Sequence, residues 1–194
     1  MLKIGITGGI GSGKSFVCKL FSLCGAPIYD ADNAAKRIMN ENVELRKEII
    51  TQFGNIFDKE NKLLNKKLAE IVFNDPHKLH LLNSIVHPKV IEDYTNWEMH
   101  QHFSYVIRES AILFESKTNV GLDFIIMVEA PEELRIKRTM DRDKRSRKQV
   151  MEIIERQMCD DEKRKLADFI ILNNDIQPLL PQVWVLNEKF LGKI

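Results

Sequence analysis

Residues 2–15, LKIGITGGIGSGKS, decide the fold of this 194-residue chain. The apolar run Leu2–Thr7 ends at glycines, which is typical of a short buried strand. The residues after it, Gly8–Ser15, fit the pattern G-x-x-x-x-G-K-[ST]. Apolar side chains then recur at helical spacing within Ser15–Leu23, and Gly25 follows as a helix stop. The sequence therefore predicts a strand, a phosphate-binding loop (the P-loop) and an amphipathic helix in direct succession.

The residue types in the loop indicate how it would bind phosphate. Its glycines let successive backbone N–H groups point inward at phosphate oxygens, and the N-terminus of the following helix adds partial positive charge. We expect the Lys14 ammonium to reach the β- and γ-phosphates of a nucleotide and the Ser15 hydroxyl to bind Mg²⁺. The alternative is a glycine-rich turn that only joins a strand to a helix. The Lys-Ser pair in a strand–loop–helix context makes that alternative the weaker one.

Strand and helix signals alternate along the rest of the chain. Further short apolar runs predict strands at Pro27–Tyr29, Tyr105–Arg108, Phe124–Val128 and Phe169–Leu172. Strands separated by helices are typical of a parallel sheet covered on both faces, so we expect an α/β fold of three layers. The other expected helices lie at about 33–39, Leu45–Phe53, Lys66–Phe73, His77–His87, Pro131–Asp141, from about 149 to Lys165, and near the end of the sequence.

One long helical block interrupts this alternation. Residues from about 41 to 103 look almost wholly helical, whereas residues 1–40 and 104–194 carry the predicted strands. We expect a single chain of the P-loop type in which this block is an inserted substrate-binding subdomain. The very polar segment at about 141–150 is expected to form a lid.

Two carboxylates, Asp30 and Asp32, follow the second predicted strand. Ligands of open parallel sheets bind beyond the carboxyl ends of the strands. A carboxylate at that edge could accept the proton of a substrate hydroxyl that attacks a γ-phosphate. Asp32 could equally cap the helix that follows, so the pattern alone leaves catalysis and capping open.

Arginines are concentrated between residues 138 and 147. Arg138 and Arg142 are four positions apart, which puts both on one face of a helix, and Arg145 and Arg147 follow in the lid segment. Arginine side chains can close over the charge that develops on a transferred phosphate. The alternative is a solvated basic face. Downstream of a P-loop, we expect at least one of these arginines to act on phosphate.

Overall composition excludes several classes of protein. Lys plus Arg number 29 and Asp plus Glu number 28, so no large net charge attracts nucleic acid or an anionic membrane. No apolar run approaches the ~20 residues that span a bilayer, and we expect no secretory signal. The cysteines Cys18, Cys24 and Cys159 form no Cys-x-x-Cys pair, which favours a reducing cytoplasm over a disulfide framework or a zinc site.

Read in order, the motifs resemble those of the dephospho-CoA kinase family. The resemblance begins with Thr7–Ser15 and Asp30-Ala31-Asp32, and it covers nearly the whole chain. It continues through Leu82-Asn83, His87-Pro88, Leu113-Phe114-Glu115, Arg138–Asp143, Gln157, Ala167-Asp168 and Asn173-Asn174.

This resemblance implies a P-loop kinase fold with a CoA-binding helical subdomain. It also implies transfer of the ATP γ-phosphate to the 3′-hydroxyl of the dephospho-CoA ribose, with Mg²⁺. The resemblance implies Asp32 as the base and Arg142 as a lid arginine. The other expected catalytic residues are Lys14, from the P-loop motif, and Arg138, from its spacing to Arg142. The implied substrate contacts are Asp32, Lys36 and His87. The implied nucleotide-binding residues are Gly8, Gly9, Gly11, Ser12, Gly13, Lys14, Ser15 and Phe16.

Departures from the family pattern are few. Lys36 stands where the family usually has arginine, which keeps a cation but loses a bidentate fork. Phe16 stands where threonine is frequent, and Ala111 where proline is frequent. Glu109, just after the third predicted strand, is a candidate for positioning Mg²⁺ through water.

Other P-loop proteins match less well. A GTPase would need Asn-Lys-x-Asp and Asp-x-x-Gly motifs, and the sequence has neither. A nucleoside or shikimate-type kinase shares the chemistry and is the alternative reading of the acceptor. The expected partners are the small molecules ATP and dephospho-CoA, with no nucleic acid and no membrane. A monomeric chain is compatible with the sequence.

Overall fold

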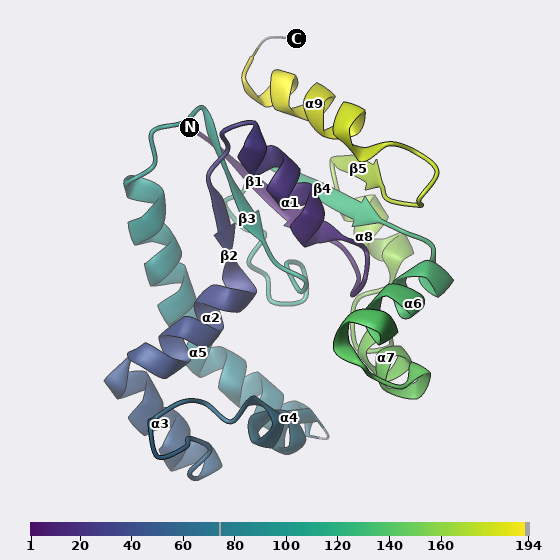
Figure 1. Cartoon of the computed structure of the whole chain (residues 1–194). Helices are drawn as coiled ribbons and strands as arrows, with labels where there is room; N and C mark the ends of the chain where they lie inside the picture. The colour runs from purple at the N-terminus through teal and green to yellow at the C-terminus, as the bar shows by residue number, and fades with distance from the viewer. Residues whose placement is uncertain (74, 193–194) are drawn as a thin grey trace. The chain divides into compact units, whose positions relative to one another are not determined.

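The structure is a computed structural model that describes residues 1–73 and 75–192 (Figure 1). The chain divides into two compact units. The first contains Met1–Asp30 and the chain from Gln101 onward, and the second contains Ala31–His100. The second unit thus starts at Ala31, whereas the sequence analysis placed the start of the inserted block at about residue 41.

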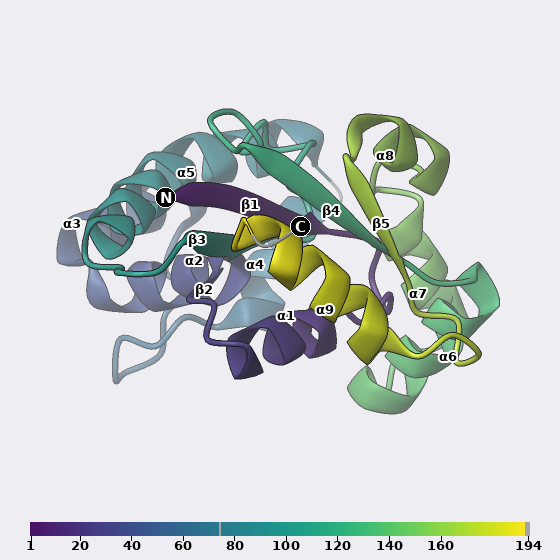
Figure 2. The ribbon, with the colours of Figure 1, turned by 90° about the horizontal axis from the view of Figure 1, so that it is seen from above.

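A parallel sheet forms the centre of the first unit (Figures 1 and 2). In the part of the chain that the structure describes, its strands are β1 (Leu2–Thr7), β2 (Ile28–Asp30), β3 (Tyr105–Glu109), β4 (Phe124–Glu129) and β5 (Phe169–Leu172). Their order is β2-β3-β1-β4-β5, and every pairing is parallel. The predicted α/β fold is confirmed. The sheet also brings the carboxyl ends of all its strands to one edge.

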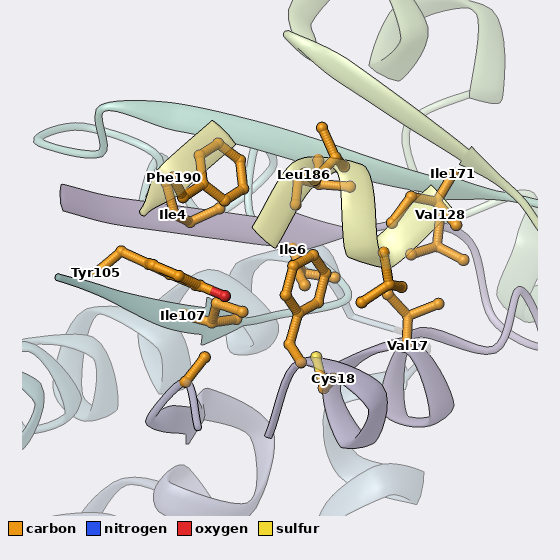
Figure 3. Close-up of a cluster of buried hydrophobic side chains, with 14 residues drawn as sticks. Ile4, Ile6, Val17, Cys18, Tyr105, Ile107, Val128, Ile171, Leu186 and Phe190 are labelled. Atoms are coloured by element: carbon orange, nitrogen blue, oxygen red, sulfur yellow. The ribbon is translucent and has the colours of Figure 1, made fainter. Parts of the chain in front are cut away.

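Helices α1 (Lys14–Leu23) and α9 (Leu179–Phe190) pack on one face of this sheet. Figure 3 shows the apolar cluster between them, in which side chains from both helices meet side chains from the strands. Its labelled members are Ile4, Ile6, Val17, Cys18, Tyr105, Ile107, Val128, Ile171, Leu186 and Phe190. The buried Tyr105 hydroxyl donates a hydrogen bond of 2.7 Å to Asn187 Oδ1, so the polar end of this ring is satisfied inside the core. Burial of this cluster fixes the start of α1 relative to β1.

The opposite face carries a smaller cluster of Leu113, Phe114 and Ile125. Ile125 belongs to this cluster whereas Ile126 belongs to the first, as the alternation of side chains along a strand requires. Three further helices of this unit are α6 (Glu132–Asp143), α7 (Arg147–Ile154) and α8 (Asp160–Leu166).

The prediction of one long helix from about residue 149 to Lys165 is wrong. Residues 155–159 separate α7 from α8. Two long-range hydrogen bonds hold this break: Gln157 Oε1 accepts from the Ile10 N–H at 2.8 Å, and the Met158 N–H donates to Glu115 Oε1 at 2.8 Å. A local helical pattern cannot report bonds to residues more than 40 positions away.

The second unit is helical, with its own core. It consists of α2 (Ala31–Glu41), α3 (Val43–Phe53), α4 (Asn65–Phe73) and α5 (Pro76–Met99). Apolar side chains that include Ile38, Ile49 and Val90 are buried within it. An ion pair of 2.6 Å between Arg37 on α2 and Asp93 on α5 joins two of its helices. Among the described residues, no helix is long and apolar enough to cross a membrane.

The expected helix end at His87 is also wrong, because α5 continues through Pro88. Proline removes one backbone hydrogen bond and crowds the preceding turn, which usually ends or kinks a helix. Here Val86 and Val90 are buried on either side of it, so tertiary packing holds the helix together across the proline. At this position, burial of apolar side chains outweighs the low helix propensity of proline.

Candidate active site

The P-loop joins β1 to α1 through residues 8–13, as the sequence predicts. Its main chain turns tightly: φ is 152° at Gly8, 77° at Gly11 and 93° at Gly13. At Gly13 space is restricted as well as conformation, because an added Cβ would lie 2.1 Å from Asn173 Nδ2. Glycine is the residue that tolerates this backbone. Since α1 starts immediately after Gly13, the positive end of its dipole lies at the loop.

Lys14 is folded back onto the loop that precedes it. Its Nζ donates a hydrogen bond of 3.0 Å to the Gly8 carbonyl, and the residue is only 8% exposed. The ammonium therefore lies against the main chain of the P-loop, at the carboxyl end of β1. A positive charge at this place attracts phosphate.

A serine and a buried carboxylate meet beside this lysine. Ser15 Oγ donates to Glu109 Oε1 at 3.1 Å, and Glu109 is 7% exposed at the end of β3. The strand register sets Asp30, the last residue of β2, opposite Glu109. Burial raises the pKa of Glu109, while the nearby charge of Lys14 lowers it and that of Asp30 raises it. The structure thus brings two acidic groups and one cation to the start of α1.

The Cys18 thiol lies one helical turn into α1, on the buried side. Burial raises its pKa, and the negative charge of Glu109 raises it further. This thiol stays protonated at neutral pH and has no nucleophilic character. Its position in the apolar cluster makes Cys18 a core residue.

Asn173 connects the P-loop to α6. It follows β5, and its Nδ2 donates to the Ser12 carbonyl at 2.7 Å. Arg138 of α6 donates to the Asn173 carbonyl at 3.2 Å and to its Oδ1 at 3.3 Å, and it also pairs with Asp175. One amide therefore ties the loop to an arginine that the sequence predicts as a site residue.

A cavity of about 660 Å³ opens beside Gly13 in the first unit. Phe16 and Arg138 line it, together with the segment 175–180 that leads into α9. Phe16 is 55% exposed, so its ring is accessible at this cavity. A volume of this size suits a small-molecule ligand.

The remaining predicted residues are Arg142, in the first unit, and three residues of the second unit. Arg142 pairs with its neighbour Asp143, with Nε 2.7 Å from Oδ1. Asp32 and Lys36 are exposed on α2, and His87 is half-buried on α5, all within the second unit. Among the described residues, Asn173 joins the P-loop to Arg138, whereas Arg142 bonds to Asp143.

Sequence reasoning missed the roles of Asn173 and Gln157 in holding the P-loop. Asn173 follows the last strand, and polar residues at the carboxyl ends of parallel strands are the positions where ligands bind. That signal could have singled out Asn173. The family resemblance includes Gln157, but no local pattern indicates its role, because its partner Ile10 is distant in sequence.

Within the described ranges 1–73 and 75–192, no three His, Cys, Asp or Glu side chains group as a metal site would require. The oxygen atoms of Ser15 and Glu109 nevertheless lie together at the P-loop, as noted above. Magnesium in nucleotide sites is commonly held by one or two protein oxygens and the phosphates, so three protein ligands are not required.

Comparison with known proteins identifies the family. Residues 2–178 match the family profile described as dephospho-CoA kinase. The chain belongs to the dephospho-CoA kinase family. A dephospho-CoA kinase of Bacteroides fragilis is 40% identical over 183 residues, which cover 94% of this chain and 89% of the relative.

Solved structures agree. The dephospho-CoA kinase of Campylobacter jejuni matches 99% of this chain and 98% of its own, with a TM-score of 0.69 and 30% identity. A shikimate kinase of Acinetobacter baumannii matches 99% of this chain and 94% of its own, with a TM-score of 0.52 and 16% identity, a likeness of fold alone. The predicted P-loop kinase fold is confirmed. Dephospho-CoA kinases are phosphotransferases that act on an alcohol group with ATP as the phosphate donor, so that part of the prediction is also confirmed.

The buried position of Glu109 predicts a pH-dependent stability effect. Burial raises the pKa of the Glu109 carboxyl group above its usual 4.5. The folded state therefore binds the carboxyl proton more tightly than the unfolded state does. Ionisation above that unfolded-state value therefore lowers the free energy of unfolding, and the penalty is complete once the pH exceeds the folded pKa. Glu109→Gln removes the charge, so we expect a higher melting temperature than the parent at neutral to alkaline pH. The gain should shrink as the pH falls toward 4.5.

Thermal unfolding across this pH range checks the prediction. Glu48→Gln on the exposed side of α3 is the matched control and should leave the melting temperature nearly unchanged at every pH. A Glu109→Gln variant less stable than the parent at alkaline pH would show instead that the charge of Glu109 stabilises the fold.

Proposed function

We propose that this chain transfers the γ-phosphate of ATP to the 3′-hydroxyl of the dephospho-CoA ribose, giving coenzyme A and ADP. One observation carries the proposal: in a member of the dephospho-CoA kinase family, the buried Lys14 ammonium and the Ser15–Glu109 pair meet at the start of α1. That arrangement supports phosphate binding by a loop whose chemistry is positioning and charge stabilisation.

In this proposal the P-loop binds the phosphates of ATP. Backbone N–H groups of Gly11 and Gly13 donate to phosphate oxygens, together with the N-terminus of α1, while the Ser12 N–H donates to the Gly9 carbonyl at 3.1 Å. Lys14 exchanges its hydrogen bond to the Gly8 carbonyl for bonds to the β- and γ-phosphates. The ammonium is already at the loop, so its ordering requires little further loss of entropy.

The cavity beside Gly13 is the proposed site of the adenosine moiety. Phe16 offers an apolar surface to a base or ribose, and the Arg138 guanidinium offers a flat cation that can stack on a purine. The ion pair of Arg138 with Asp175 fixes its orientation at the cavity wall. This contact favours nucleotide binding for Arg138 over the catalytic role that its helical spacing suggests.

The pair Ser15 and Glu109 fits a bound Mg²⁺. Ser15 Oγ would bind the ion directly, and the Glu109 carboxylate would hold it through water, as their separation of 3.1 Å allows. When bound, Mg²⁺ neutralises charge on the β- and γ-phosphate oxygens. The chain's own contribution is a buried anion whose charge is only partly balanced by Lys14.

The lid arginine in this proposal is Arg142. Among the described residues its guanidinium bonds to the adjacent Asp143, an ion pair near the surface that contributes little to stability. It can therefore leave Asp143 for a transferring phosphate at small cost and stabilise the charge there.

The second unit is the proposed CoA-binding subdomain. Asp32, Lys36 and His87 are its proposed acceptor contacts, with Asp32 as the general base that takes the proton of the ribose hydroxyl. Asp32 comes two positions after Asp30, the last residue of β2, and is exposed on the first turn of α2. An exposed carboxylate on a helix start is accessible to a substrate hydroxyl.

The proposed partners are small molecules alone, ATP and dephospho-CoA. A cytoplasmic location fits the three cysteines, all of which are free thiols. The acceptor decides between this function and the kinases of similar fold.

Release of ADP from ATP and Mg²⁺ tests the acceptor directly. We expect rapid ADP release with dephospho-CoA, and at least about a hundredfold lower kcat/KM with adenosine, nucleoside monophosphates or shikimate, because a pocket built for polar groups rejects acceptors that lack them. Mass spectrometry of the product should show one added phosphate. Equal or greater turnover with shikimate or a nucleoside would reassign the acceptor.

Asp32→Asn separates catalysis from a structural role. Asp32 is the second residue of α2, so it is not the N-cap that the sequence allowed. The amide keeps the size of the side chain, but it cannot take a proton. We expect kcat to fall by about 10²–10⁴, while the melting temperature changes little, since even a lost cap costs only about 1 kcal/mol.

Asp75→Asn is the matched control, because Asp75 caps α5 by accepting the His77 N–H at 3.0 Å and the Lys78 N–H at 3.2 Å. It should leave kcat unchanged. If Asp32→Asn behaves like Asp75→Asn at saturating dephospho-CoA, Asp32 is a structural residue.

A further inference from the structure

Three side chains hold the outer side of the P-loop, and none of them belongs to the phosphate-binding motif. Gln157, in the break between α7 and α8, accepts the Ile10 N–H at 2.8 Å. Arg135 of α6 lies against Gly9, and Asp160 at the start of α8 pairs with Arg135 at 2.8 Å. We call Gln157, Arg135 and Asp160 the P-loop brace.

The Arg135 guanidinium fills the space where a side chain at Gly9 would go. An added Cβ at Gly9 would lie 1.7 Å from Arg135 Nη1 and 2.8 Å from its Cζ. The motif itself accepts any residue at this position, and the φ angle of Gly9 lies outside the left-handed region. A side chain at position 9 would therefore have to displace the Arg135 guanidinium, whereas the backbone conformation of Gly9 would accept one.

Arg135 is a buried cation, with its side chain 4% exposed and its Nε without a hydrogen-bond partner. Burying a charge is costly unless it is paired, and Asp160 supplies the pair. The main chain of the same residue also encloses the loop, because an added Cβ at Gly11 would lie 2.3 Å from the Arg135 carbonyl oxygen. α6 thus packs directly on the loop at two of its glycines.

We propose that the P-loop brace positions the main chain of Gly9–Gly11 for phosphate binding. A glycine-rich loop has large conformational freedom, and a loop that must be ordered when its ligand binds loses affinity. Gln157 fixes the loop through one N–H, and Arg135 with Asp160 blocks outward movement of Gly9. These are positioning residues, since they act on phosphate through the loop. The inference depends on the proposed function in one respect: it takes a nucleotide as the ligand of the loop.

Gln157→Ala tests the hydrogen-bonded part of the brace. Titration calorimetry with ADP should show a loss of affinity of about tenfold, equivalent to about 1.4 kcal/mol. In turnover, KM for ATP should rise while KM for dephospho-CoA stays unchanged. Loss of a merely structural bond would lower the melting temperature and leave ADP affinity as it is.

Asp168→Ala is the matched control. Asp168 accepts the Ile125 N–H at 2.8 Å at the start of β4, at the edge of the sheet opposite to the carboxyl ends. The Asp168→Ala variant loses a comparable bond between a side chain and a main-chain N–H. Its melting temperature should therefore fall, while its ADP affinity should remain within about twofold of the parent. Equal ADP affinities for Gln157→Ala and Asp168→Ala would overturn the role of Gln157.

A second pair of variants tests the contact between Arg135 and Gly9. Gly9→Ala should weaken ADP binding by about tenfold or more in the parent, because the methyl group displaces the guanidinium. In an Arg135→Ala background the same change should have less than about a threefold effect, since the clash is gone and the two changes are not additive. Additive effects, or a harmless Gly9→Ala in the parent, would overturn the proposal.

ADP binding needs no acceptor. Failure of the brace would therefore appear as unchanged ADP affinity in these variants. Failure of the proposed function would appear as normal ADP binding without transfer to dephospho-CoA.

Discussion

The main chain of the P-loop is packed so closely by its neighbours that most of its glycine positions have no space for a side chain. The rest of the site depends on this constraint. An added Cβ would lie 2.3 Å from the Val128 carbonyl oxygen at Gly8, 2.3 Å from the Arg135 carbonyl oxygen at Gly11, and 2.1 Å from Asn173 Nδ2 at Gly13. β4, α6 and the segment after β5 therefore all press on one short stretch of main chain. The loop can be held in a fixed shape because its glycines let these neighbours approach it.

Charged side chains also lie close together at the P-loop. Lys14 is held at the Gly8 carbonyl, and Glu109 and Asp30 end adjacent strands of the sheet. The two acidic side chains and the Lys14 ammonium form a site that favours cations near Glu109 and phosphate near Lys14. A protein that needed only stability would gain from replacing the buried Glu109, whose burial disfavours its charged form. The proposed Mg²⁺ site would account for its presence.

The sequence sufficed for the sheet, the P-loop and the family, because those depend on local patterns: an apolar run, a glycine-rich motif and a helix in succession. It failed where distant contacts override local propensity. The α7–α8 break depends on bonds from Gln157 and Met158 to Ile10 and Glu115, and α5 passes through Pro88 because its neighbours are buried.

The candidate site was also predictable only in part from the sequence. The motif marks Lys14 and Ser15, and the Ser15–Glu109 contact follows from the ends of parallel strands. The partner of Arg138 did not follow, because Asn173 meets it only in the folded chain. The same holds for Arg135, since its helical position gives no sign that it packs against Gly9.

The central claim is that the Lys14 ammonium acts on the phosphates that this loop binds, and Lys14→Met tests it most directly. Methionine keeps the apolar stem and removes the charge. With Lys19→Met, an exposed lysine on the same helix, as the control, the kcat for phosphorylation of dephospho-CoA should fall by at least about 10²-fold in Lys14→Met alone. Both variants should remain folded. Turnover by a folded Lys14→Met variant close to that of the Lys19→Met control would contradict the account.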